Sequence, residues 1–401
     1  MMFFELAFST FFGVLAGVFT GLTPGIHTNL VAVATLSFSP FLLRYFSPLS
    51  VCAFIISLSV TNTFVDSIPS VFLGAPDSEK ALGVLPGHRY LLKGLGYFAV
   101  KLCVIGGFFS LLLSLAFFPI TVLIIKYTYA FLQDYIGYFL IAVVIYMLYL
   151  SEKRLWSIFV FLLSGILGVV AFNLPSLKDP LFPMLSGLFG ISTLLISLRD
   201  TNSIPEQKVS EGIKIRKSIV AKALFSGQFS GFLAAMLPGL GSSQAAVISM
   251  QITKKLGDYG FLILLSAINT ANFVLSISTL YTIEKARNGS IVAVSQILGN
   301  LPPSHAAIFL IVALLSGCLS SYITLKIAKV FALLMKRVNY RKLVVAVIAL
   351  ITALVIMLTG ALGFFVLVVS TCVGIIPAET KVRRTNAMGC LMLPVILYFI
   401  L

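Results

Sequence analysis

Long uninterrupted runs of apolar residues constrain this chain more than any other feature. Residues 155–172 and 343–358 contain no charged side chain, and residues 141–150 form a third such run. These runs approach the roughly 20 residues that a helix needs to cross the hydrocarbon core of a bilayer. Lipid offers the backbone no hydrogen-bond partners, so the runs are expected to be helices. Membrane β-barrels show alternating segments of about ten residues instead. We therefore predict an all-α, polytopic, multi-pass protein of the cell membrane.

The composition excludes an ordinary soluble domain. Of 401 residues, 59% are hydrophobic and 10% are charged, whereas soluble domains carry roughly 25% charged residues. The net charge of +15 comes from 28 basic and 13 acidic residues. Basic residues concentrate in the cytoplasmic loops of membrane proteins, and no basic region here is interleaved with aromatic residues on a soluble domain. We therefore expect the basic residues to lie beside a lipid bilayer, and we expect no nucleic acid as a partner.

No motif of enzyme chemistry is present. The chain contains no GxxxxGK[ST] phosphate loop, no GxSxG elbow and no His/Cys metal spacing. We predict a protein that is not an enzyme and that has no cofactor and no metal site. The five cysteines are isolated and are interpreted as small core residues; they are Cys52, Cys103, Cys318, Cys372 and Cys390. Residues 1–21 lack a basic n-region, so they are interpreted as a retained membrane segment.

One stretch of the chain occurs twice. Residues 13–29 (GVLAGVFTGLTPGIHTN) align without a gap with residues 227–243 (GQFSGFLAAMLPGLGSS). Both contain two glycines four residues apart, a Pro-Gly pair and then small polar residues. The repeat divides the chain into a first transmembrane half, residues 1–198, and a second, residues 219–401. A polar linker, residues 199–218, joins them.

The basic loops predict how the segments are oriented. The linker carries Arg199, Lys208, Lys214, Arg216 and Lys217, so it is expected in the cytoplasm. Assigning the segments in turn from the linker places both termini outside the cytoplasm and makes equivalent segments of the two halves cross in opposite directions. This inverted-topology repeat is typical of secondary transporters, whose binding sites lie near the midplane where the repeats meet. By the same assignment, His88 and Arg89 are expected at the cytoplasmic surface.

The two Pro-Gly pairs are the leading candidates for a binding site. Proline lacks a backbone donor and glycine lets the chain turn, so each pair is expected to break a helix at membrane depth. The next helix would start at small polar residues, and its free N–H groups would suit an anion. A simple kink that serves close helix packing is the alternative for either motif alone; its recurrence in both halves favours the site. The predicted substrate-binding residues are Pro24, Gly25, Thr28, Asn29, Pro238, Gly239, Ser242 and Ser243.

Polar residues inside apolar segments supply further candidates. Asn62 lies in a Thr-Asn-Thr cluster and Asn269 in an Asn-Thr-Ala-Asn cluster. Each would hydrogen-bond either the substrate or a neighbouring helix, and both are kept as substrate-binding candidates. Asp66 is the acid that lies deepest by sequence context. It is a candidate for carrying a coupling proton or sodium ion, with capping of the turn before Pro69 as the alternative.

These residues resemble the large permease subunit of the tripartite tricarboxylate transporters, the TctA family, including its divergent archaeal branch. The resemblance rests on residues 17–29, 67–94 and 231–244. It implies an inverted-repeat permease for carboxylates, driven by an ion gradient. It also implies a small membrane subunit and an extracytoplasmic binding protein as partners. Substrate binding would carry over to the two Pro-Gly segments.

Three hypotheses follow. The first is an ion-coupled secondary transporter of an organic anion, such as a di- or tricarboxylate, bound between the two Pro-Gly breaks. The second is a translocase for a lipid-linked phosphate, whose phosphate would bind the same helix ends while its tail lies in an apolar groove. The third is a membrane-embedded enzyme or assembly scaffold, which would need Asp66, Glu79 and His27 to meet.

Overall fold

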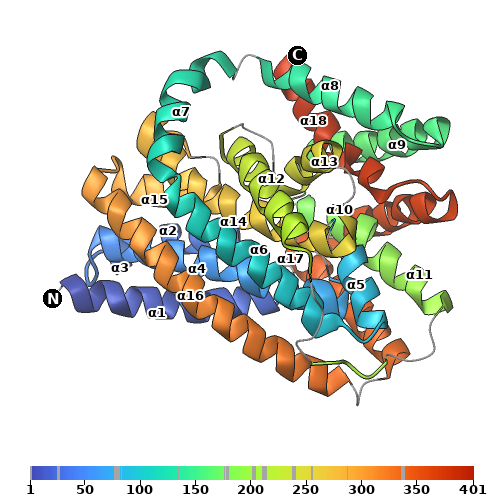
Figure 1. Ribbon diagram of the computed structural model, residues 1–401, viewed down its shortest axis with the longest axis horizontal. Coiled ribbons are helices and arrows are strands. Elements are labelled where there is room, and N and C mark those ends of the chain that lie inside the picture. Colours follow the sequence, from blue (N-terminus) through green and yellow to red (C-terminus); the bar gives the residue numbers. More distant parts are fainter. Residues whose placement is uncertain are drawn as a thin grey trace.

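The computed structural model consists of helices and connecting segments throughout the part of the chain that it describes (Figure 1). The described residues are 2–24, 28–75, 82, 84–132, 135–175, 177, 180–200, 205–209, 215–236, 241–253, 256–286, 288–335 and 339–401.

The first half contains α1 (Met2–Leu22), α2 (Thr28–Ser37), α3 (Ser39–Leu42), α4 (Pro48–Val65), the π-helical η1 (Pro69–Leu73), α5 (Val84–Leu92), α6 (Gly96–Ala116), α7 (Phe118–Leu132), α8 (Ile136–Tyr149), α9 (Arg154–Phe172), α10 (Leu181–Leu185), the π-helical η4 (Ser186–Ile191) and α11 (Ser192–Asp200). The second half contains α12 (Lys217–Met236), α13 (Ser242–Ile252), α14 (Gly257–Ile283), α15 (Gly289–Leu298), α16 (Pro303–Leu334), α17 (Tyr340–Glu379), the 3₁₀-helical η6 (Arg384–Met388) and α18 (Gly389–Ile400).

Eight helical segments of the described chain are long and apolar enough to cross a membrane, which confirms the all-α polytopic prediction. They start at Phe3, Pro48, Gly96, Arg154, Lys217, Gly257, Pro303 and Arg341. The segment that starts at Arg341 is the longest, and it is interrupted where Gly360 adopts φ 71°. Residues other than glycine rarely adopt a positive φ, so this position requires glycine.

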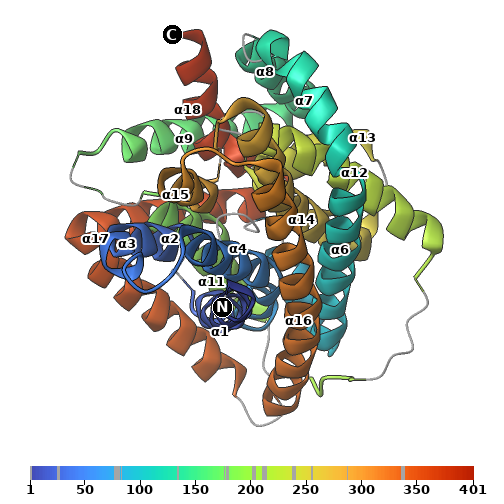
Figure 2. The same cartoon turned by 90° about the vertical axis from the view of Figure 1, so that its left-hand side faces the viewer.

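Helices α4 and α14 form the centre of the molecule. Helix α14 is buried along its membrane-length window, and the α4 segment is almost as fully buried. Both are rich in serine, threonine and asparagine, which in lipid would lack partners but here meet other helices. Helix α1 packs on α4, and helix α12 packs on α14. Figure 2 shows α6 and α16 side by side next to this centre, in agreement with their direct packing.

Glycines set the register of these two central pairs. A Cβ on Gly17 would lie 2.5 Å from the Leu58 carbonyl oxygen, and one on Gly231 would lie 2.5 Å from the Ala271 Cβ. The facing pairs are Gly13–Ser57, Gly17–Thr61, Gly227–Ala267 and Gly231–Ala271. Partner numbers rise together within each pair of helices, so α1 runs parallel to α4 and α12 runs parallel to α14. The sequence repeat is therefore matched by a repeat of packing.

Each Pro-Gly region lies in a hairpin. The amide of Ser47, after α3, donates to the Glu5 carboxylate at the start of α1, so the chain returns to the end at which it began. In the second half, the hydroxyls of Ser226 and Ser249 bond to each other and hold α13 back against α12.

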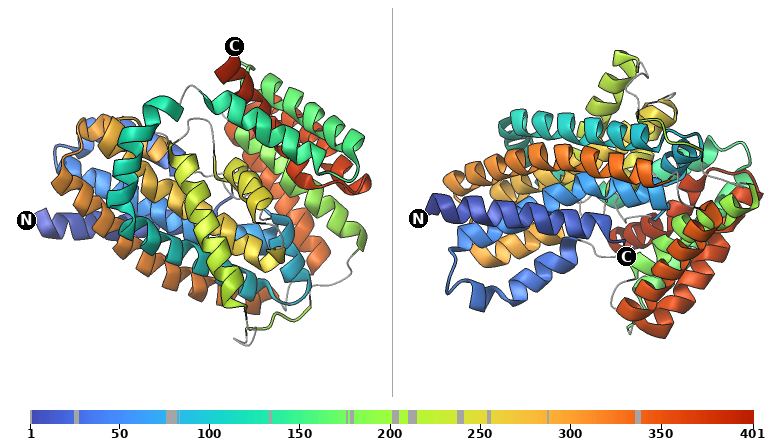
Figure 3. Two further views of the ribbon diagram at one scale, coloured as in Figure 1. Left: turned by 45° about the horizontal axis from the view of Figure 1, so that its top comes forward. Right: turned by 90° about the horizontal axis from the view of Figure 1, so that it is seen from below.

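The last helix of each half packs against the other half of the chain. Helix α18 packs on α9, while α11 and the η4 segment that leads into it pack on α17. Gly168 faces the carbonyl of Cys390, and Gly374 faces the carbonyl of Leu188. Figure 3 shows the green helices α8 and α9 beside the red α17 and α18 at one end of the molecule, with α1, α6 and α16 toward the other. The two halves are therefore interlocked.

Part of the linker is built into the fold. Gln207 is 3% exposed. Its side-chain oxygen accepts from the amide of Gly96 at 2.9 Å, and its side-chain nitrogen donates to the carbonyl of Leu91 at 3.0 Å. The amide of Lys208 donates to the carbonyl of Gly94 at 2.8 Å. Because these bonds satisfy the end of α5 and the start of α6, the linker fixes that corner.

Two expectations for individual residues are corrected. His88, expected at the surface, is 2% exposed, because it packs under η1 with its Nδ1 3.4 Å from the carbonyl oxygen of Val71. Burial lowers the pKa of this imidazole to about 4, so the ring is neutral at physiological pH. Cys318 and Cys372 are exposed rather than core residues; they lie on the long helices α16 and α17.

We predict that Gly168→Ala disrupts the α9–α18 contact. The new methyl group would overlap the backbone carbonyl of Cys390, which cannot rotate away. Overpacking of this kind costs about 1–3 kcal/mol, and thermal melting of purified protein in detergent would measure it. Val170→Ala, on the exposed side of the same helix, is the control and should leave the melting temperature nearly unchanged. Equal melting of both variants would contradict the interlocked packing.

Candidate functional site

The first helices of both halves end where the sequence predicts. Helix α1 ends at Leu22, two residues before Pro24, and α2 begins at Thr28. Helix α12 ends at Met236, and α13 begins at Ser242. In the first half, the described backbone has already left the helix at Thr23 and Pro24. Gly25, Pro238 and Gly239 lie outside the described residues, as does the side chain of Asn29.

The start of each new helix is buried. Thr28 is 6% exposed, Ser242 is 0% exposed and Ser243 is 1% exposed. Gly241, which precedes α13, has an extended backbone at φ −82° and ψ 175°. The first amide groups of a helix have no acceptor within it and make its end partly positive. Two such ends inside one apolar molecule are suited to a negatively charged guest.

A line of polar side chains on α4 and α14 connects the two breaks. We call Asn62, Asp66, Asn269 and Asn272 the polar seam. Asn62 Nδ2 donates to the hydroxyl of Thr20, near the end of α1, at 3.2 Å. Asn269 Nδ2 donates to Asp66 Oδ2 at 3.3 Å. Asn272 Nδ2 donates to the hydroxyl of Ser242, at the start of α13, at 3.3 Å.

Helical spacing makes the polar seam continuous. Asn62 and Asp66 are four residues apart, and the amide of Asp66 donates to the carbonyl of Asn62 at 3.1 Å. Asn269 and Asn272 are three residues apart on α14. Residues at these spacings share one face of a helix. The side chains of each helix therefore reach both the nearby break and the facing helix.

The structural counterpart of Asn62 is Asn272, not Asn269. Because Thr61 faces Gly17 as Ala271 faces Gly231, the next residue in each helix occupies the equivalent place. Each of these two asparagines also bonds to a hydroxyl at the edge of a break. Asn272 lies in the second polar cluster of the sequence but is not among the predicted site residues. The glycine contacts were the signal that could have distinguished it.

Asp66 lies at the junction of the two halves. It is 3% exposed and follows the last residue of α4, three residues before the π-helical η1 begins at Pro69. Its carboxylate receives the Asn269 amide from the other half of the chain. A carboxylate buried in an apolar molecule is costly unless it is protonated, paired or hydrogen-bonded. The charge state of Asp66 therefore depends on residues of both halves.

Hydroxyl groups surround the polar seam. Thr63 and Thr270 lie 3.2 Å apart, oxygen to oxygen, across α4 and α14. Other buried hydroxyls on α4, α12 and α14 have no hydrogen-bond partner among the described residues; they belong to Ser59, Thr61, Ser230 and Ser266. An unsatisfied buried hydroxyl costs about 1–3 kcal/mol. These buried hydroxyls could therefore form hydrogen bonds with a bound solute.

Among the described residues, no group of three or more His, Cys, Asp or Glu side chains is close enough to hold a metal ion. His27 and Glu79 lie outside the described residues.

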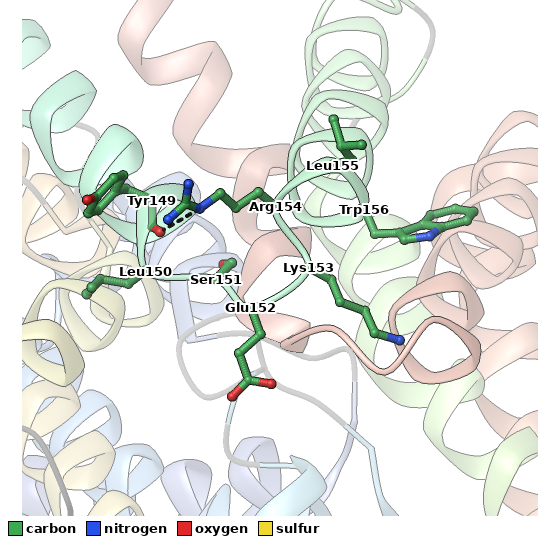
Figure 4. A pocket seen from close by; sticks show the side chains of 8 residues that line it. All are labelled: Tyr149, Leu150, Ser151, Glu152, Lys153, Arg154, Leu155 and Trp156. Carbon is green, nitrogen blue, oxygen red and sulfur yellow. Dashed lines mark hydrogen bonds between the residues drawn. The ribbon is translucent and has the colours of Figure 1, made fainter.

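One surface depression lies apart from the polar seam. It has a volume of about 760 Å³ and surrounds the loop between α8 and α9, with eight lining residues in a row from Tyr149 to Trp156 (Figure 4). Arg154 Nε donates to the Tyr149 carbonyl at 3.2 Å, and its guanidinium carbon lies 4.7 Å from the Tyr149 ring centre. Because one loop supplies all of the lining residues, the depression does not bring the two halves together around a solute.

Comparison with known proteins identifies relatives of the whole chain. The model of the tripartite tricarboxylate transporter TctA family matches residues 7–389. An uncharacterized protein of Methanocaldococcus jannaschii is 30% identical over 397 residues, which cover 97% of each chain. No solved structure matches the chain.

We predict that Asp66 and Asn269 are energetically coupled. Asn269→Ala would remove a donor from a buried carboxylate and lower the free energy of unfolding by about 1.5–3 kcal/mol. After Asp66→Asn, the same alanine substitution should cost less, because no charge remains to be stabilised. A double-mutant cycle from denaturant unfolding in detergent measures the difference. Strictly additive effects would show that the two side chains do not interact.

Proposed function

Since this chain belongs to the tripartite tricarboxylate transporter TctA family, which is a family of transporters and not of enzymes, we propose that it is an ion-coupled secondary transporter. Its substrate is an organic anion, a di- or tricarboxylate. The substrate binds between the two Pro-Gly breaks. The family match favours this function over the translocation of a lipid-linked phosphate.

The observation that carries the proposal is the polar seam. It connects a residue at the end of α1 with a residue at the start of α13 through side chains of both halves. A solute that contacts one break therefore affects hydrogen bonds that lead to the other. Secondary transporters with repeats place their substrates at such a junction, against the ends of interrupted helices.

Each predicted residue has a role in this proposal. The backbone amides that follow Pro24-Gly25 and Pro238-Gly239 bind the carboxylates, with Thr28, Asn29, Ser242 and Ser243 as capping or direct partners. Asn62, Asn269 and the added Asn272 hold the breaks in register. Asp66 takes up the coupling ion, a proton or sodium, because a single positive charge would neutralise its carboxylate.

The architecture of the proposal is an inverted repeat of residues 1–198 and 219–401. The matching parallel pairs, α1 with α4 and α12 with α14, support the repeat, and the charges of the loops support its inversion. The linker, residues 199–218, faces the cytoplasm, and both termini face the opposite side. The word tripartite in the family description supports two further components, and we propose that they are a small membrane subunit and an extracytoplasmic binding protein.

Uptake into proteoliposomes tests the function. Labelled citrate or succinate should accumulate when a proton or sodium gradient is imposed, and Asp66→Asn should abolish the dependence on the gradient. Glu152→Gln, in the exposed α8–α9 loop, is the matched control and should transport normally. Absence of uptake of any di- or tricarboxylate under either gradient would overturn the proposal.

A separate prediction concerns the breaks. Pro24→Ala restores a backbone donor and removes the ring that prevents the helix from continuing. A continued helix would use the backbone amides after Pro24 in its own hydrogen bonds, so substrate affinity should fall by tenfold or more while the protein remains folded. Circular dichroism would check folding, and substrate titration of uptake would give the affinity. A folded variant with unchanged affinity would remove the Pro24 break from the binding site.

A further inference from the structure

The loop between α8 and α9 lies at one end of two membrane-length segments. Helix α9 begins at Arg154, and the long segment of α17 ends at Glu379; both are apolar enough to cross a membrane. The ammonium group of Lys153 donates to the carbonyl oxygen of Thr380 at 2.9 Å, so the start of one segment and the end of the other lie at the same level. Residues 150–153 and 380–383 therefore lie at the depth of the lipid headgroups.

Basic side chains gather on these two loops. Lys153 and Arg154 line the depression of Figure 4, and the second loop carries Lys381 and Arg383; all four side chains are exposed. Neither Lys153 nor Arg154 forms an ion pair with another described residue. The acid of the lining is Glu152, whose carboxylate points away from Arg154 in Figure 4. The two cations of the lining are therefore available to an anion.

The fold holds both of these cations in place. Arg154 donates from Nε to the carbonyl of Tyr149, and its guanidinium lies over the Tyr149 ring. Lys153 is held by the carbonyl of Thr380. Each hydrogen bond uses one donor, whereas a guanidinium has five N–H groups and an ammonium has three. The remaining donors can bind phosphate oxygens, for which both types of side chain are suited.

An apolar surface continues from the depression along α9. Leu155 is 84% exposed and Trp156 is 48% exposed, and both line the depression. Tryptophan and tyrosine are enriched where headgroups meet acyl chains, because their rings are partly apolar and partly polar. Exposed apolar residues follow Leu155 at helical spacing and form a stripe on α9; they are Phe159, Leu162, Ile166 and Val170. Phosphate partners thus lie directly beside a surface for acyl chains.

We propose that the α8–α9 loop binds the headgroup of an anionic phospholipid. Lys153 and Arg154 bind its phosphate, Lys381 and Arg383 add attraction, and an acyl chain lies along the exposed stripe of α9. Because Lys153 belongs to the first half and bonds to the second, the lipid binds where the two interlocked halves meet. This site is separate from the polar seam and from the binding of the transported solute.

Trp156 makes the site directly observable, because it is the single tryptophan of the chain. Bromine atoms on an acyl chain quench the fluorescence of a tryptophan that they contact. The full chain is reconstituted in phosphatidylcholine vesicles that contain a small fraction of brominated phosphatidylglycerol or, in parallel, of brominated phosphatidylcholine. The phosphatidylglycerol should quench Trp156 at a several-fold lower fraction. Equal quenching by the two lipids would overturn the proposal.

Variants of the two cations test their role. Lys153→Gln and Arg154→Gln should each reduce the preference for phosphatidylglycerol by about fivefold, the effect of one cation beside an anionic headgroup. Lys326→Gln is the matched control, because Lys326 is an exposed lysine that lies 5.2 Å from the Tyr322 ring centre but does not line the depression. It should keep the wild-type preference. If Lys153 and Arg154 only cap the ends of α17 and α8, their variants would melt at a lower temperature with an unchanged lipid preference, which would contradict the proposal.

Soluble glycerol phosphate distinguishes a lipid from a free phosphate. Because it lacks acyl chains, it should restore the fluorescence of Trp156 only at far higher concentration than unbrominated phosphatidylglycerol does. Equal potency would overturn the assignment to a lipid. The comparison of the two brominated lipids needs only the wild-type chain, so it decides the question even if neither variant folds.

Discussion

The absence of water inside the membrane is the constraint on which the rest of the structure depends. A polar group on a central helix receives no hydrogen bond from lipid, so its partners must come from the protein or from a bound solute. Helices α4 and α14 carry many such groups and are therefore surrounded on all sides. Their asparagines satisfy this demand by bonding to the hydroxyls of Thr20 and Ser242 and to Asp66. The polar residues thus determine which helices pack against α4 and α14. The apolar residues fill the space between these helices.

Glycine makes this selection possible. Helices α1 and α12 approach the central helices closely because Gly17 and Gly231 have no side chain at the contact. In lipid, close packing of small residues replaces the hydrophobic effect as the force between helices. The same glycines formed the core of the repeat in the sequence. One short motif therefore sets both the packing of α1 and α12 and the place where these helices end.

Much of the fold could be predicted from local chemistry. The ends of α1 and α12 and the starts of α2 and α13 follow from proline, glycine and small polar residues close together in the chain. Relations across the molecule could not be predicted in this way. Asn272 is the counterpart of Asn62 only because α12 lies in a particular register on α14. The burial of His88 depends on the position of η1, and the role of Gln207 depends on a linker that looks like an unstructured polar segment.

The exchange of terminal helices limits how this molecule can move. Helix α18 is seated against α9, and η4 is seated against α17, with backbone contacts at Gly168 and Gly374. A rigid rotation of one repeat away from the other would break the α9–α18 contact and the η4–α17 contact at the same time. The mobile body in a transport cycle must therefore be assembled from pieces of both repeats, such as the hairpins that carry the Pro-Gly breaks. The interlocked helices would then serve as its stationary frame.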